Sequence, residues 1–176
     1  MRRTVNDVDW LPGRWALAIA SVAYGVWWVV EALTLPAQSP GKMGFDGQVT
    51  RWDSKASSLT MSAVVGALTA LVFWLMPVLL KRIPSGLVNV PNPDYWRRPE
   101  NYPEAVRRIS DPMSRFGAAT LVLLISMQVV MWAVALGKPL PTWAPVVALV
   151  LYLAYVVWWI AKLYRQFRVP GRRSAR

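Results

Sequence analysis

Acidic side chains are the main groups in this sequence that could take part in acid–base or ion-binding chemistry. The 176-residue chain has nine Asp and Glu residues but no His and no Cys. Metal sites built from thiolates or imidazoles, His-ligated haem and nucleophiles that depend on Cys or His are therefore excluded. Phosphate-binding glycine motifs are absent, and Asp46 and Asp53 lack the spacing of a calcium loop. We predict no catalytic residue, no metal site and no cofactor, so an enzyme is not expected.

Glu31 is the one carboxylate inside a long apolar run, and such a residue is a functional candidate by default. Tyr24, Trp27 and Trp28 precede it at spacings that place their rings on its own face of a helix. Glu31 could carry a proton or pair with a cation of another chain. It could instead be structural, reaching the head groups or a neighbouring helix, and its place near the end of the run favours this role. Gln128, in the middle of another run, is expected to hydrogen-bond between helices.

Four apolar runs must position these residues, and each is long enough to cross a membrane. About 20 helical residues span the roughly 30 Å hydrocarbon core, and in lipid every backbone amide must be satisfied within the helix. The runs cover residues 15–35, 59–80, 116–136 and 144–163. The predicted fold is all-α: residues 1–176 form a single polytopic membrane domain with four transmembrane helices.

Basic residues predict the orientation of these spans. All but four of the 20 Lys and Arg residues lie before the first run, between the second and third, or at the end of the fourth and beyond it. The four on the opposite side are Lys42, Arg51, Lys55 and Lys138. The positive-inside rule then places both termini and the insert at residues 81–115 in the cytoplasm, with the loop at residues 36–57 outside.

The net charge of +11 raises the question of nucleic-acid binding. The basic residues lie next to the ends of the spans, and the sequence has no groove-reading or RNA-stacking motif. Membrane topology and attraction to anionic lipid head groups account for the charge. We therefore expect contact with anionic lipids at the cytoplasmic face and no nucleic-acid partner.

Small residues repeat at four-residue spacing on two of the runs. Ser62, Gly66 and Ala70 form one such stripe, and Ser21 and Gly25 form another. Small residues at this spacing allow helices to approach closely in lipid. Both stripes are therefore predicted to serve packing within the bundle.

A polar, proline-rich segment at residues 89–100 interrupts the apolar sequence. Its prolines favour an extended backbone. Tyr95 and Trp96 carry amphipathic rings, and Arg97 and Arg98 follow them directly. Such a patch is typical of a partner-docking surface, but it also fits a structural lid that closes the cytoplasmic end of the bundle. Both interpretations remain open at this point.

The proline-rich insert is also expected to contain a short interfacial helix. Pro103 can occupy a first helical position, and the helix is predicted to end at Ser110. Val106, Ile109 and Met113 fall on one face of the segment, as in helices that lie in the membrane surface.

Two segments resemble a known bacterial family. Leu35-Pro36, Gly44 to Gln48 and Trp52 to Lys55 look like the outer loop of the domain that begins SdpI-like proteins, and the segment from Pro91 to Glu100 resembles the family signature after the second span. SdpI-like proteins are integral membrane immunity and signalling proteins, and one type protects against a secreted toxin and sequesters a regulator at the membrane. The resemblance covers about residues 35–109 and implies a multi-pass protein of the bacterial inner membrane.

Two functions follow as hypotheses. The first is a non-catalytic membrane interaction protein, either an accessory subunit or an SdpI-like immunity or signalling module, that binds another membrane protein, a cytoplasmic partner or a second copy of itself. Its candidate partner-binding residues are Asp94, Tyr95, Trp96, Arg97, Arg98 and Glu31. The alternative is a small transporter or channel component that uses Glu31 and Gln128.

Overall fold

The chain folds into a bundle of long helices. A computed structural model describes residues 12–44, 47–138 and 140–169. Its long helices are α1 (Pro12–Thr34), α2 (Lys55–Arg82), α4 (Tyr102–Ala135) and α5 (Trp143–Gln166). All four are long and apolar enough to cross a membrane. The prediction of a mostly helical protein with four candidate spans is therefore confirmed.

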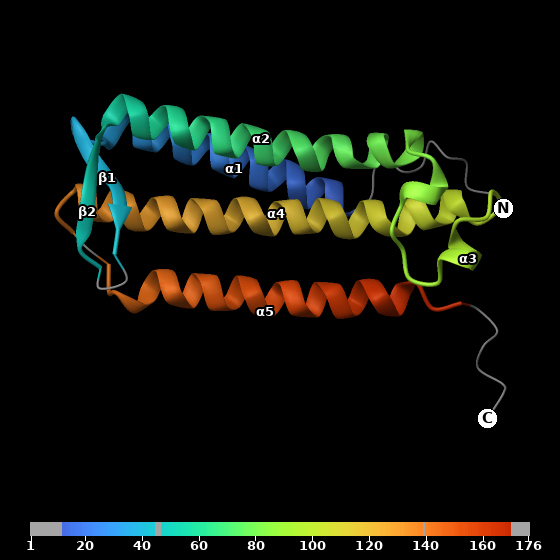
Figure 1. The fold of residues 1–176 in the computed structure, drawn as a ribbon. Helices are drawn as coiled ribbons and strands as arrows, with labels where there is room; N and C mark the ends of the chain where they lie inside the picture. The colour runs from blue at the N-terminus through green and yellow to red at the C-terminus, as the bar shows by residue number, and fades with distance from the viewer. Residues whose placement is uncertain (1–11, 45–46, 139, 170–176) are drawn as a thin grey trace.

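Helix α4 is the central element of the bundle. Helices α1 and α2 pack on one side of α4, and α5 packs against its other side (Figure 1). No described residue of α5 is buried, whereas eleven residues of α4 are. The bundle therefore has most of its packed interior around α4.

Close approach between helices depends on particular glycines. A Cβ atom at Gly66 of α2 would overlap the ring of Tyr24 in α1, and one at Gly117 of α4 would overlap the ring of Phe73 in α2. The predicted packing role of the stripe in α2 is thus confirmed at Gly66. The expectation for Gly25 is wrong, because a Cβ atom there would meet no atom within 4 Å.

The segment between α1 and α2 folds into a hairpin at one end of the bundle (Figure 1). Strands β1 (Gln38–Met43) and β2 (Val49–Ser54) pair antiparallel. The side chain of Ser54 accepts a hydrogen bond of 3.2 Å from the amide of Ser57, which caps the start of α2. Between the strands, Phe45 and Asp46 lie outside the described residues, and Gly47 has a φ of 80°.

The proline-rich segment lies at the other end of the bundle and is less extended than predicted. After the short 3-10 helix η2 (Ser85–Leu87), a one-turn helix α3 (Pro93–Trp96) forms. Asn92 precedes it with a φ of 56°, a left-handed conformation that Asn adopts more readily than most residues. This residue turns the chain, and Pro93 then supplies the φ of a first helical position.

The prediction of a separate interfacial helix at residues 103–110 is also wrong. Helix α4 begins at Tyr102, with a proline in its first turn as predicted, but continues through Pro112 to Ala135. Val106 and Ile109 are buried in a protein cluster rather than facing a membrane surface. Packing of this face against the rest of the chain stabilises a continuous helix despite the internal proline.

Candidate functional site

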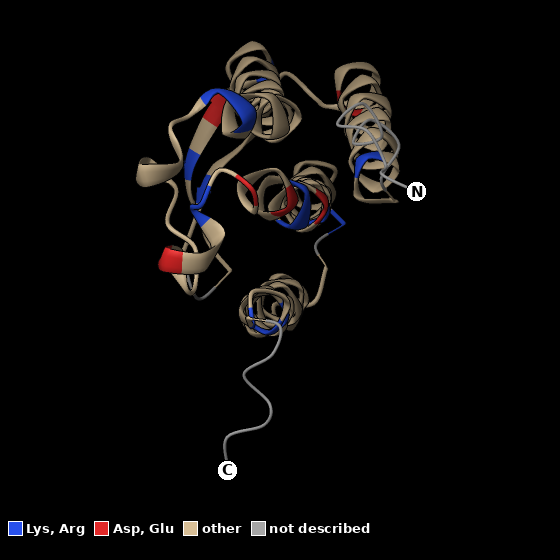
Figure 2. Ribbon diagram, turned by 90° about the vertical axis from the view of Figure 1, so that its right-hand side faces the viewer, with Lys and Arg blue, Asp and Glu red and all other residues tan. Residues whose placement is uncertain are grey.

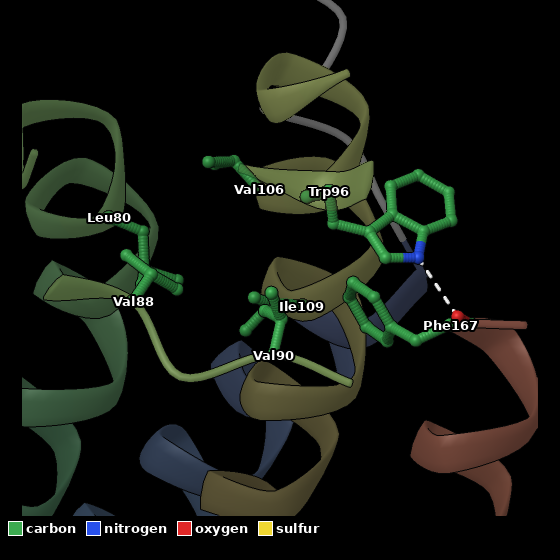
Figure 3. Close-up of a cluster of buried hydrophobic side chains, with 8 residues drawn as sticks. Leu80, Val88, Val90, Trp96, Val106, Ile109 and Phe167 are labelled. Atoms are coloured by element: carbon green, nitrogen blue, oxygen red, sulfur yellow. Dashed lines mark hydrogen bonds between the residues drawn. The ribbon is translucent and has the colours of Figure 1, made fainter. Parts of the chain in front are cut away.

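The proline-rich segment is anchored by the side chain of Trp96. This residue is only 2% exposed and packs with the ends of α2 and α4 and with Phe167, which directly follows α5. Its indole N–H donates a hydrogen bond of 2.9 Å to the main-chain carbonyl of Phe167 (Figure 3). The two rings meet edge to face, with centroids 5.4 Å apart. Trp96 is therefore part of the packed interior.

Several polar contacts join the same cluster, which we call the Trp96 cluster. The side-chain amide of Asn92 also donates to the Phe167 carbonyl, at 2.9 Å. The hydroxyl of Tyr102 lies within hydrogen-bond distance of the carbonyls of Leu80 and Ile83, at 2.8 and 3.0 Å. These contacts connect α3 to the end of α5 and the start of α4 to the end of α2. This arrangement favours the structural lid over a docking role for Trp96 itself.

Arg108 is a further part of the cluster that sequence reasoning did not single out. Its guanidinium lies over the Trp96 ring, 4.6 Å from the ring centroid, and donates to the carbonyl of Gln166. The same side chain donates to the carboxylate of Glu104 at 2.8 Å. Only the run of basic residues in the insert indicated this role, because Gln166 is 58 positions from Arg108 in the sequence.

The neighbours of Trp96 form a fixed polar surface, which we call the α3 platform. Asp94 and Arg98 are exposed, and Tyr95 and Arg97 are half-buried. Arg97 donates to the carbonyl of Val88 at 3.1 Å, and Arg98 donates to the carbonyl of Asp94 at 2.9 Å. Figure 2 views the bundle from this end and shows Lys and Arg residues on several of its segments, with acidic residues among them.

Glu31 lies far from the α3 platform, near the hairpin end of α1. The structure therefore separates it from the other predicted partner-binding residues. Glu31 is 5% exposed and lines a cavity of about 520 Å³ between the hairpin and helices α1, α2 and α4. No described Lys or Arg forms an ion pair with it. The indole N–H of Trp27 lies near the carboxylate, yet it makes no hydrogen bond of ordinary geometry with any described group.

Gln128 lines the same cavity and connects three helices. Its side-chain amide donates to the Tyr24 hydroxyl at 2.6 Å, and that hydroxyl donates to the main-chain carbonyl of Ser62 at 2.7 Å. The expected interhelical hydrogen bond is thus confirmed, between α4 and α1. The structure also brings Glu31 and Gln128 to one cavity.

The hairpin contributes cavity residues that the sequence did not reveal. Arg51 and Asp53 line the cavity and form an ion pair of 2.9 Å with each other. Met61, Met127 and Met131 add flexible apolar surface. The spacing of Met127 and Met131 indicates one helix face, but nothing in the sequence indicates that the hairpin folds over it.

The bundle is apolar on the far side of Tyr24 from Glu31. Buried Leu17, Ala20, Ala118 and Leu121 pack together there with Tyr24. Within residues 12–44, 47–138 and 140–169, no group of three or more acidic, His or Cys residues could hold a metal ion. The cavity, which has both polar and apolar lining, therefore lies next to an apolar layer of the bundle.

Comparison of the chain with protein-family models, curated proteins and solved structures finds no match. The α3 platform and the cavity are therefore the two sites from which a function is inferred.

Proposed function

We propose that the protein is a non-catalytic membrane interaction protein of the bacterial inner membrane, related to SdpI-like modules. Both termini and the α3 platform face the cytoplasm in this proposal. Four helices able to cross a membrane support it, as does the excess of basic residues at the platform end (Figure 2). The partner is another membrane protein or a second copy of the chain, with anionic lipids around the contact.

The observation that carries the proposal is the fixed presentation of the α3 platform. Burial of Trp96 holds the one-turn helix in place, and the bonds of Arg97 and Arg98 to backbone carbonyls restrict their side chains. A surface that is ordered before binding loses less side-chain entropy on contact. Exposed Asp94 beside Arg98 also offers both signs of charge, which suits a protein partner better than a purely anionic surface.

Charge reversal at the platform tests this function. Arg98→Glu should remove a stoichiometric companion from the gently solubilised protein, as measured by quantitative mass spectrometry. Lys81→Glu is the matched control, because Lys81 is exposed at the end of α2 but lies outside the platform. Equal loss in both variants would indicate general attraction to lipid. Recovery of the wild type as a lone monomer would refute the proposal.

The second candidate function is a transporter or channel component. The shared cavity of Glu31 and Gln128 favours it. The apolar layer around Leu17 and Leu121 opposes a continuous polar path through this conformation. Solute flux into liposomes that is abolished by Glu31→Gln would support transport, and an absence of flux across ions and small solutes would eliminate it.

A further inference from the structure

We propose that the cavity at the hairpin end binds a small organic monocation whose ammonium group pairs with Glu31. The cavity of about 520 Å³ lies within the roughly 300–1,000 Å³ range of small-molecule sites. This role goes beyond the proposed partner interaction, which concerns the opposite end of the bundle.

Charge is the first indication of the ligand. The charged residues that line the cavity are Glu31, Arg51 and Asp53. Arg51 pairs with Asp53 at 2.9 Å, so these two charges compensate each other. Glu31 is buried without an ion pair to any described basic residue. A buried carboxylate without a counter-ion is costly, and a monovalent cation in the cavity would neutralise it.

The hydrogen-bond pattern is the second indication. Tyr24 has a single hydroxyl proton, which it donates to the carbonyl of Ser62. The Tyr24 oxygen can therefore only accept from Gln128, so the Gln128 NH₂ group must face it. This leaves the Gln128 Oε1 atom buried without a partner among the described residues. Glu31 and Gln128 therefore both line the cavity, and Gln128 adds a buried acceptor that has no partner among the described residues.

The remaining lining selects an organic ion over a hard metal ion. Tyr24 and Trp132 bring aromatic rings to the cavity, and Met61, Met127 and Met131 bring thioethers. Four serines also line it, and the hydroxyls of Ser39, Ser58 and Ser62 already form hydrogen bonds within the protein. Aromatic faces attract alkylammonium groups, and methionines adapt to apolar shapes. Calcium and magnesium instead require six or more oxygen ligands, which include several carboxylates or waters. An ammonium group on an aromatic or aliphatic body fits this lining.

Binding of 2-phenylethylamine, protonated at neutral pH, tests the inference against its neutral analogue 2-phenylethanol. Equilibrium dialysis on the full chain in nanodiscs should show saturable binding of the amine and binding of the alcohol weaker by about tenfold or more. Glu31→Gln should reduce amine binding to the level of the alcohol. Glu100→Gln is the matched control, because Glu100 is an exposed carboxylate at the other end of the bundle and outside the α3 platform, so binding should be unchanged.

A second variant guards against misfolding of the Glu31 variant. Gln128→Met keeps the side-chain length but removes Oε1, so it should weaken binding of the amine more than binding of the alcohol. Equal binding of amine and alcohol to the wild type, full amine binding by Glu31→Gln, or no saturable binding of the amine would overturn the inference. None of these results depends on whether the α3 platform binds a partner.

Discussion

Replacing Trp96 by Ala should destabilise the bundle more than any other single change at the α3 end. The side chain is 2% exposed, and truncation of a buried Trp or Phe to Ala costs about 3–5 kcal/mol. The carbonyl of Phe167 keeps Asn92 as a donor, so no orphaned acceptor adds to this cost. Loss of the Arg108 contact over the ring adds about 0.5–1 kcal/mol.

A thermal-unfolding assay in mild detergent measures this change. For a chain of this size a loss of 1 kcal/mol lowers the Tm by about 2–4 °C, so the summed cost of Trp96→Ala should lower it by roughly 7–24 °C. Trp158→Ala is the matched control, because Trp158 is 52% exposed on α5, and its Tm should change little. A Trp96→Ala protein with the wild-type Tm would refute the assignment of Trp96 to the packed interior. If that protein also lost its partner, Trp96 would be a docking residue instead.

Two further predictions concern contacts between helices. Gly66→Ala should destabilise the fold by about 1–3 kcal/mol, since its Cβ atom would displace the Tyr24 ring, whereas Gly25→Ala should be neutral or slightly stabilising; chemical denaturation in detergent compares the two. Asp111→Ala should cost about 0.5–2 kcal/mol and speed amide exchange at the start of α1, because Asp111 accepts a hydrogen bond of 2.7 Å from the Gly13 amide. Unchanged exchange at the start of α1 would contradict that cap.

The four long helices were predictable because lipid leaves an apolar chain little choice of structure. The length of each apolar run predicts most helix ends to within a few residues, since backbone groups in a membrane must form hydrogen bonds within the helix. The exception is α4, which begins at Tyr102 instead of near residue 116. Its first turns are too polar for a span, and they are helical because Val106 and Ile109 pack into the Trp96 cluster.

The two sites were less predictable because each depends on contacts between distant residues. Trp96 and Phe167 are 71 positions apart, and no local pattern indicates that one donates to the other. Tyr24 and Gln128 are 104 positions apart. Residue type did indicate Glu31 as unusual, but its local spacing could not distinguish a head-group contact from a cavity. The hairpin decides that question, because it packs against α2 and α4 and lines the cavity with Arg51 and Asp53.

The proline-rich segment between α2 and α4 attaches the end of helix α5 to the bundle. No described residue of α5 is buried. Its hydrogen bonds to the bundle include the one that the Trp159 indole N–H donates to the carbonyl of Pro112, at 2.8 Å. Phe167, directly after α5, is by contrast fully buried. The end of α5 is thus held by the proline-rich segment, since Asn92 and Trp96 both donate to Phe167. The same contacts that attach α5 fix the outward-facing α3 platform, so in this protein the structural and the proposed binding roles belong to opposite faces of one segment.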